Sequence, residues 1–167
     1  IPSILNKQNR KDAFNQNIID RSFSNGKNLY KTDDVSKKLY AIYNTKCAYC
    51  EKNIDDEDKH IEHYRPKKEY HWLAYSWDNL LFSCGKCNKF KGDKFETIEQ
   101  KVTYQNESYS DIHNLSDSYN DLEKPLLINP EKDNVLDDIK FNREAEIYSA
   151  NIRVKYTIEE ACNLNRK

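Results

Sequence analysis

The sequence predicts an α+β fold, a single compact domain organised around two pairs of cysteines. Three observations lead to this expectation. The 167 residues are 37% hydrophobic and 33% charged, which suits one polar domain with a modest core. The pattern Cys-x-x-Cys occurs twice, as "CAYC" at 47–50 and "CGKC" at 84–87. Helix-like and strand-like patterns lie on both sides of these pairs.

Residues 1–45 are expected to form a helical lead-in. The first 30 residues carry no sustained apolar period and predict irregular structure or a short helix. The segment 32–44 predicts an amphipathic helix, because Val35, Leu39 and then Ile42 or Tyr43 recur at helical spacing. Thr32, with the two aspartates that follow it, can cap the start of this helix.

Residues 46–95 contain the cysteine pairs and predict a zinc site. Two thiolates at this spacing can face one tetrahedral zinc, so Cys47 and Cys50 together with Cys84 and Cys87 make a closed four-sulfur site. Disulfides or redox thiols are the alternative, which a cytoplasmic setting disfavours. The gap of residues 51–83 exceeds the about 15–20 residues of a simple zinc ribbon, so we expect an insertion between the pairs.

Residues 96–167 are expected to form a C-terminal extension with a β-hairpin and a helix. The polar stretch 96–121 predicts mostly loop, in which a short helix is the alternative. The apolar run between Pro125 and Pro130 predicts an extended segment on the core. "DIKFN" and "AEIYSA" alternate apolar with polar residues and predict the hairpin. Thr157 with Glu160 forms a capping-box pattern and predicts the start of a terminal helix, on which Cys162 is expected to be buried.

Charge is unevenly distributed along a chain whose formal net charge is −1. Residues 59–94 hold eight Lys/Arg against four Asp/Glu, whereas residues 105–146 hold eleven acidic residues against four basic ones. The basic segment coincides with the cysteines and histidines. No stretch approaches the roughly 18 apolar residues of a membrane span, and no signal peptide is recognisable, so we expect a soluble cytoplasmic protein without membrane contact. The chain lacks methionine, and we expect further residues at both ends.

Three motifs lie between and after the cysteine pairs: "IEHYRPK" at 61–67, "WDNLL" at 77–81 and "CNKFK" at 87–91. With the cysteines, they resemble the HNH endonucleases of the ββα-metal class, which have a treble-clef-like core. That family's pattern runs from a cysteine pair through an acidic-His dipeptide and Pro to Asn-Leu and Cys-x-x-Cys-Asn-x-x-Lys. The chain departs from it at Glu62, where Asp is commoner, and at Asn88, which replaces the His of the motif's third letter.

The resemblance implies a role for each motif residue. His63 is expected to be the general base that takes a proton from water. Glu62, on the opposite face of the strand, and Asn88 are expected to bind a catalytic Mg²⁺ or Mn²⁺, while zinc holds the scaffold. Asn79 is expected to fix the imidazole and its loop. Backbone phosphates of nucleic acid are expected to meet five lysines: Lys67, Lys68, Lys86, Lys89 and Lys91.

Each of these residues also has a structural interpretation. Glu62 can be an exposed strand carboxylate, Asn79 and Asn88 can cap a turn and a helix, and Lys91 can be a solvated helix residue. The remaining histidines, His60, His71 and His113, are expected to be structural. So are the aromatic residues Tyr70, Trp72, Tyr75 and Trp77, which are expected to pack around the hairpin of the metal site.

A narrower resemblance covers residues 45–166. "CAYCE", "IEHYRPK", "SCGKCN", "KPLLINPEKDN" and "TIEEACNLNR" are similar to the HNH subunit of Septu-type anti-phage defence systems, which is also found attached to some retrons. The resemblance implies a co-encoded ABC-type ATPase as partner and, in retrons, a reverse transcriptase with its RNA/DNA. We expect a metal-dependent endonuclease, with the acidic extension binding the partner and DNA as substrate. The alternatives are RNA such as tRNA as substrate, or a non-catalytic zinc-knuckle adaptor for nucleic acid or the ATPase.

Overall fold

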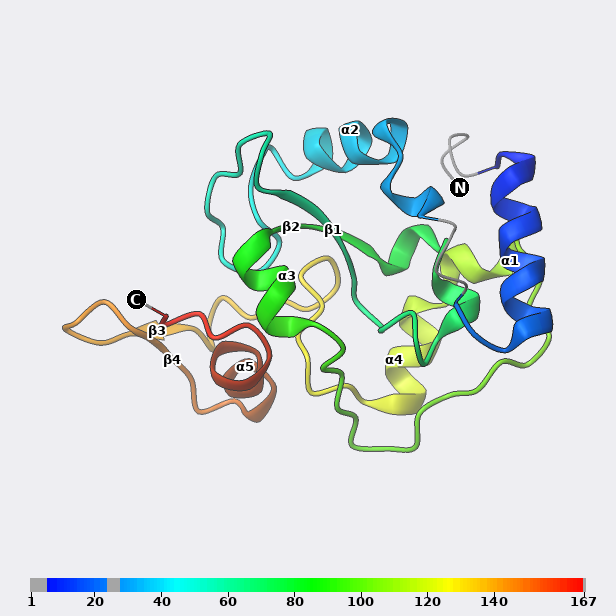
Figure 1. Cartoon of the computed structure of the whole chain (residues 1–167). Coiled ribbons are helices and arrows are strands. Elements are labelled where there is room, and N and C mark those ends of the chain that lie inside the picture. Colours follow the sequence, from blue (N-terminus) through cyan, green and yellow to red (C-terminus); the bar gives the residue numbers. More distant parts are fainter. Residues whose placement is uncertain (1–5, 24–27, 167) are drawn as a thin grey trace.

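The structure is a computed structural model that describes residues 6–23 and 28–166. Residues 1–5, 24–27 and 167, which belong to the expected lead-in and extension, lie outside the described residues. The described chain is α+β, as the sequence predicts. Figure 1 shows a central pair of strands with helices around it and a second, small hairpin at the far end.

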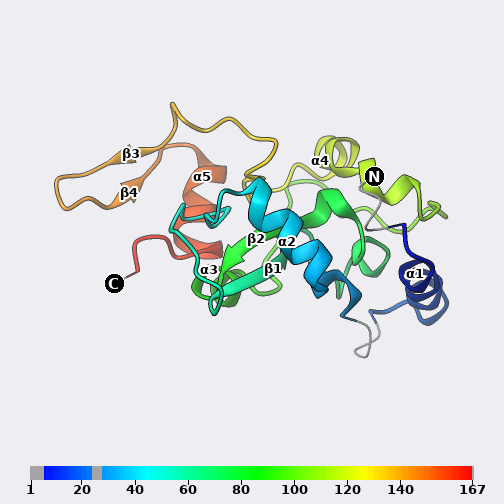
Figure 2. The ribbon, with the colours of Figure 1, turned by 90° about the horizontal axis from the view of Figure 1, so that it is seen from above.

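The central pair consists of β1 (Lys59–His63) and β2 (Leu80–Cys84), which are antiparallel and run from Lys59 opposite Cys84 to His63 opposite Leu80. The helix α3 (Gly85–Lys91) follows β2 directly. Every residue of β2 is buried, because α2 covers one face of the pair and α3 the other. Figure 2 shows α2 crossing the strand pair. The result is the expected ββα unit.

The lead-in is more helical than the sequence predicts. The helix α1 spans Gln8–Asp20, where we expected irregular structure or a short helix. Its buried positions mix apolar side chains with Arg10 and Asn17, so its apolar period is weak. The helix α2 spans Asp33–Ile42 and buries Val35 and Leu39 as expected, while the alternative Ile42 is half exposed.

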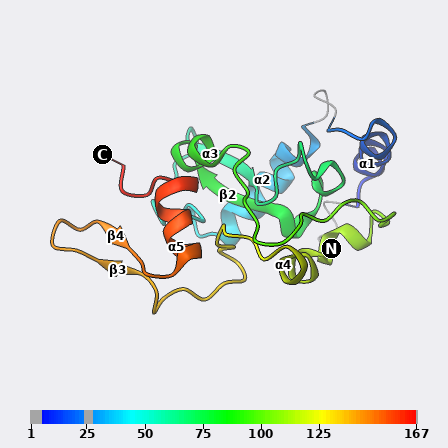
Figure 3. The ribbon, with the colours of Figure 1, turned by 90° about the horizontal axis from the view of Figure 1, so that it is seen from below.

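The extension contains α4 (Ser116–Glu123) and then the hairpin of β3 (Lys140–Phe141) and β4 (Ile147–Tyr148). The extended segment after Pro125 packs on the core as predicted, with Leu127 and Ile128 buried. Figure 3 shows the β3–β4 hairpin projecting from the body of the molecule beyond α5. The helix α4, which buries Glu123, is a short helix at the end of the stretch expected to be mostly loop, in agreement with the alternative given for it.

The predicted start of the terminal helix is wrong. The helix α5 spans Ile152–Tyr156 and continues as a π-helical turn over Thr157–Ala161. Asn151 is the capping residue, since its side chain accepts hydrogen bonds from the first turn of α5. Thr157 lies inside the helix, where its hydroxyl donates to the carbonyl of Arg153, a bond that threonine readily makes within helices.

The buried core joins all three regions of the chain. It contains Ala13 of α1, Leu39 of α2, both strands of the central pair, and Cys162 after the last helical turn. Cys162 is therefore a buried apolar residue, as expected. Within the part of the chain that is described, no helix has the length and apolar character needed to cross a bilayer.

Candidate functional site

Four cysteine sulfurs form one cluster. The Sγ atoms of Cys47, Cys50, Cys84 and Cys87 all lie within 4.8 Å of one another, and Sγ of Cys50 is 3.8 Å from Sγ of Cys84. A zinc tetrahedron with bonds of about 2.3 Å has sulfur–sulfur edges of about 3.8 Å, which fits this spacing. All five cysteines are free, so the disulfide alternative does not hold. The cluster can hold a metal ion, and its donor set suits zinc.

Backbone hydrogen bonds position the two Cys-x-x-Cys turns, residues 47–50 and 84–87, which we call the two knuckles. The amide of Cys47 donates to the carbonyl of Lys52 at 2.9 Å, and the neighbouring Ala48 donates to the carbonyl of Phe82 in β2 at 2.8 Å. The second pair lies at the start of α3, where the amide of Cys87 donates to Sγ of Cys84. The first knuckle is thereby attached to the strand that leads into the second.

Arg166 adds a contact to the sulfur cluster that the sequence did not suggest. Its Nη2 lies 3.2 Å from Sγ of Cys87 and 3.9 Å from Sγ of Cys84. A guanidinium at this position offsets the excess negative charge of four thiolates. The last residues of the extension therefore lie against the cysteines near the middle of the chain.

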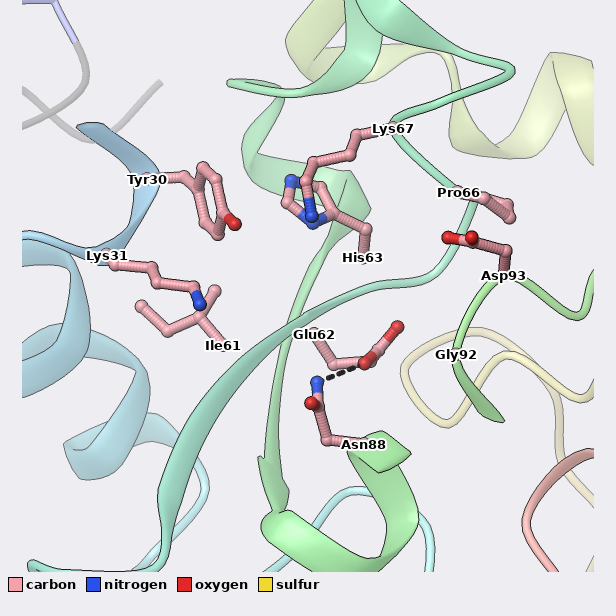
Figure 4. Close-up of a pocket in the computed structure, with 10 residues that line it drawn as sticks. All are labelled: Tyr30, Lys31, Ile61, Glu62, His63, Pro66, Lys67, Asn88, Gly92 and Asp93. Atoms are coloured by element: carbon pink, nitrogen blue, oxygen red, sulfur yellow. Dashed lines mark hydrogen bonds between the residues drawn. The ribbon is translucent and has the colours of Figure 1, made fainter. Parts of the chain in front are cut away.

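A pocket of about 140 Å³ lies beside β1 and α3. Figure 4 shows its lining from three separate segments of the chain. The lining residues are Tyr30, Lys31, Ile61, Glu62, His63, Pro66, Lys67, Asn88, Gly92 and Asp93. Three of the four residues with an expected catalytic role thus meet in one pocket, and Asn79 lies outside its lining. His60, His71 and His113 do not line it either.

His63 is buried at the end of β1 and has a defined tautomer. Its Nε2 lies 2.9 Å from the carbonyl oxygen of Ala74. A carbonyl only accepts, so Nε2 carries the proton and Nδ1 has the free lone pair. Burial lowers the pKa of His63 to about 3, and the ammonium groups of Lys67, Lys91 and Lys31 act in the same direction. The imidazole is therefore neutral at pH 7.

Glu62 points to the opposite face of β1 from His63 and meets α3. Its Oε2 accepts a hydrogen bond from the amide of Asn88, and its Oε1 lies 2.9 Å from Nζ of Lys91. Burial raises the pKa of Glu62, while Lys91 opposes that shift. The carboxylate of Glu62 thus accepts from the amide nitrogen of Asn88 at the pocket wall (Figure 4). Each side chain also has an oxygen atom of the kind that hard cations bind.

Asn79 orients the loop after β1. Its Oδ1 accepts from the amide of Arg65 at 2.7 Å, and its Nδ2 donates to the carbonyls of Arg65 and Leu73 at 3.1 and 3.2 Å. These three bonds all go to backbone atoms of Arg65 and Leu73, and none of them goes to the imidazole of His63. Leu73 precedes Ala74, whose carbonyl holds His63, and Asn79 can therefore fix the imidazole only through that turn.

The five lysines expected at phosphate are not equivalent. Lys67 lines the pocket, whereas Lys86 and Lys89 are exposed on α3 outside its lining. Lys68 is exposed and forms an ion pair with Asp93. The expectation for Lys91 is wrong, because its side chain is fully buried and its ammonium is bonded to Glu62 and to the carbonyl of His63. Lys91 neutralises the pocket carboxylate and cannot reach a phosphate outside.

Sequence reasoning missed Tyr30 and Lys31, which come from the lead-in. The ring of Tyr30 is buried against the imidazole of His63, with centroids 4.4 Å apart and planes at 70°. Lys31 lines the same pocket. Neither residue lies in a recognisable motif, so no local signal in the sequence marks them.

The comparison with protein families agrees with this geometry. Residues 47–94 match the family model described as HNH endonuclease. This segment is therefore similar to HNH endonuclease domains. It contains both cysteine pairs, Glu62, His63, Asn79 and Asn88, and it ends just after α3. Tyr30 and Lys31 lie upstream of the HNH domain.

Three curated proteins are similar to the chain. Septu protein PtuB of Bacillus mycoides (strain KBAB4) is 38% identical over 86 residues, which are 43% of this chain and 29% of that protein. Septu protein PtuB of Bacillus thuringiensis is 40% identical over 70 residues, 41% of this chain and 27% of that protein. Septu protein PtuA of Bacillus mycoides (strain KBAB4) is 24% identical over 147 residues, 79% of this chain and 19% of that protein.

The matched segments span less than a third of each of these relatives' own length. They relate the chain to Septu proteins, with the strongest identity to the two PtuB proteins. No solved structure matches the chain.

Proposed function

We propose that this protein is a metal-dependent endonuclease that hydrolyses phosphodiester bonds of nucleic acid, with DNA as the favoured substrate. One observation carries the proposal. A neutral histidine with a protonated Nε2 and a free Nδ1 lines the same pocket as a contacting carboxylate and amide, within an HNH domain. A general base next to hard oxygen ligands is what hydrolysis of a phosphodiester requires.

His63 is the proposed general base. Because Nε2–H is bonded to the carbonyl of Ala74, Nδ1 accepts the proton of a water that attacks the phosphorus. Transfer of that proton makes the ring an imidazolium, which the same carbonyl stabilises through the Nε2–H bond. Asn79 acts as a positioning residue, since it holds the backbone of the turn that carries this carbonyl.

Glu62 and Asn88 are the proposed ligands of a divalent cation, Mg²⁺ or Mn²⁺. Carboxylate and amide oxygens are ligands that such hard cations prefer over zinc's thiolates. When bound there, the cation offsets negative charge on the phosphate in the transition state. Lys91 bonds to Oε1 of Glu62, and Oε2 accepts from Nδ2 of Asn88. Rotation of the Asn88 amide would exchange that hydrogen bond for a cation held by Oε2 of Glu62 and Oδ1 of Asn88. Zinc on the four cysteines would hold the end of β2 and the start of α3 against the first cysteine pair.

Anti-phage defence with a co-encoded ABC-type ATPase is the proposed biological setting, in a reducing cytoplasm that suits five free cysteines. Similarity to proteins named Septu PtuB and PtuA supports it. The β3–β4 hairpin is the proposed partner-binding element of the extension. Phe141 and Tyr148 of the hairpin are 63 and 50% exposed, and Leu136 before it and Ile152 after it are 81 and 66% exposed, which together make an exposed apolar group.

The partner proposal is tested on the hairpin alone. Removing the whole extension would also remove Glu123, whose buried carboxylate pairs with Arg65 beside the active site. A double substitution, Phe141→Ser with Tyr148→Ser, should therefore abolish co-purification with the ATPase and leave zinc content unchanged. Retained association would refute the assignment of this hairpin.

The nuclease itself is tested with plasmid DNA and total RNA, each with Mg²⁺, Mn²⁺ or excess chelator, using protein of verified zinc content. Cleavage that depends on the added cation supports the proposal, and the polymer that is cut identifies the substrate. The assay is repeated with the ATPase, since the proposed partner can license the nuclease. Nucleic acid that is bound but never cut would favour the zinc-knuckle adaptor instead.

A further inference from the structure

The lead-in forms one wall of the catalytic pocket and is firmly attached there. Residues 29–32 form a strap that leads into α2, and the buried guanidinium of Arg10 bonds to two of its members and to the first turn of α2. Nε donates to the carbonyl of Leu29 at 3.0 Å, and Nη2 donates to Thr32 and to Asp34, the latter at 3.1 Å. The strap is thus held on both sides of Tyr30 and Lys31, whose side chains reach the pocket (Figure 4).

Two ammonium groups converge on the ring of Tyr30. Nζ of Lys67 lies 5.3 Å from the ring centroid, and Nζ of Lys31 lies 5.6 Å from it. The same ring contacts the imidazole of His63. Lys67 comes from the loop after β1 and Lys31 from the strap, so two distant segments place positive charge beside the general base.

Neither of these lysines has a carboxylate partner among the residues that the structure describes. The nearby lysines differ, because Lys68 is paired with Asp93 and Lys91 with Glu62. Two ammonium groups around one ring repel each other, and an anion between them removes that repulsion. An unpaired pair of cations that lines a small pocket is therefore suited to a phosphate group.

We propose that Lys31 is a further catalytic residue, which with Lys67 binds the scissile phosphate on the His63 side of the pocket. The inference rests on the proposed nuclease function and extends it beyond the HNH domain, since residues 47–94 alone do not contain this lysine. The two ammonium groups offset charge on the phosphate oxygens that face away from Glu62 and Asn88. The lead-in thus completes the active site.

The test compares Lys31→Ala, Lys31→Arg and a matched control, Lys38→Ala, which removes an exposed lysine of α2 outside the pocket lining. Cleavage is measured as kcat and KM with Mn²⁺. Binding of a short labelled DNA duplex, and of single-stranded RNA of the same length, is measured against salt concentration. The binding variants are made in a His63→Ala background, so that no substrate is consumed. Zinc content and melting temperature are checked for each protein.

Lys31→Ala should lower kcat by about tenfold to a hundredfold, at or below the loss from removing one donor of an oxyanion site. Lys31→Arg, which keeps the charge, should retain kcat within about threefold of the unmodified protein. In the binding assay, Lys31→Ala should reduce the slope of log affinity against log salt by about 0.9 for a duplex, or about 0.7 for a single strand. Lys38→Ala should change neither quantity.

Lys31→Ala that behaves like Lys38→Ala in both assays would overturn the proposal. If the unmodified protein cuts nothing, either alone or with the ATPase, the binding assay decides alone. A smaller salt slope in Lys31→Ala would then support the phosphate site, while the nuclease proposal would be rejected. An unchanged slope, or no binding of either polymer, would reject both the phosphate site and the nuclease.

Discussion

The ammonium of Lys91 lies 2.9 Å from Oε1 of Glu62, and both side chains are buried between β1 and α3. The same ammonium donates to the carbonyl of His63 at 2.8 Å. One lysine thus attaches the last turn of α3 to both residues of the Glu-His dipeptide. A buried carboxylate without such a partner would be costly, and Lys91 opposes the rise that burial causes in the pKa of Glu62.

Replacing Lys91 by methionine should destabilise the protein by about 3–5 kcal/mol, because Glu62 is left buried without a compensating charge. Urea unfolding of zinc-loaded protein measures the change. Lys89→Met, an exposed neighbour on α3, should stay within about 0.5 kcal/mol of the unmodified protein. Adding Glu62→Gln to Lys91→Met should recover part of the loss. A Lys91→Met protein as stable as the Lys89→Met control would contradict the described pairing.

Asn79→Ala should separate positioning from metal binding. The substitution removes three hydrogen bonds to backbone atoms of Arg65 and Leu73, and the groups left unsatisfied should cost about 1–3 kcal/mol in stability. Cleavage should fall more than about tenfold, since small misplacement of a reacting group is expensive. Zinc content should not change. Asn114→Ala serves as the exposed control. Equal cleavage by the two variants would show that Asn79 does not position His63 for cleavage.

Stability should fall in mild acid because of His113. This buried ring accepts a hydrogen bond from the amide of Trp77 through Nδ1, and burial lowers its pKa to about 4. The unfolded state, with a pKa near 6.5, binds the proton first, so stability is present above pH 6.5 and is lost as the pH falls toward 4. Between pH 7 and pH 5 this amounts to about 2 kcal/mol.

The contribution of His113 is isolated by His113→Asn, whose side-chain oxygen can still accept from Trp77. The free energy of unfolding of each protein is measured at pH 7 and pH 5. The variant should lose about 2 kcal/mol less than the unmodified protein over that interval. Equal losses would show that His113 does not carry the acid sensitivity.

Arg166 should slow the loss of zinc. Its guanidinium lies 3.2 Å from Sγ of Cys87, and groups that support metal ligands typically change metal affinity by about 10- to 100-fold. Transfer of zinc to a chromogenic chelator should therefore be at least about tenfold faster in Arg166→Ala. Arg143→Ala removes an exposed arginine from the loop between β3 and β4 and should transfer zinc at the unmodified rate. Indistinguishable rates in the two variants would mean that the contact has no effect on zinc.

The sequence was most informative where chemistry restricts spacing. The four-sulfur site was predicted from the two cysteine pairs, because a tetrahedral site needs its sulfurs at defined intervals along the chain. The pocket could be outlined for the same reason, since Glu62, His63 and Asn88 sit at motif positions. The neutral state of His63 follows from burial, which no local pattern reports.

Other features depend on contacts between distant residues, which a single sequence does not encode locally. Lys91 looked like a surface lysine, and its burial depends on a carboxylate 29 positions earlier. The helix α1 was missed because Arg10 and Asn17 occupy its buried face. Thr157 resembled a helix cap, although Asn151 had already started that helix. Lys31 reaches the pocket only because Arg10 holds the strap.

The central claim is that His63 is the base of a nuclease, and it is tested most directly by comparing His63→Ala with His60→Ala. Both variants remove an imidazole from β1, but only His63 lines the pocket. At equal zinc content, with Mn²⁺ and the polymer that the unmodified protein cuts, His63→Ala should lose cleavage by more than about a hundredfold, and His60→Ala should keep it. Cleavage that survives in His63→Ala at the level of His60→Ala would contradict the account.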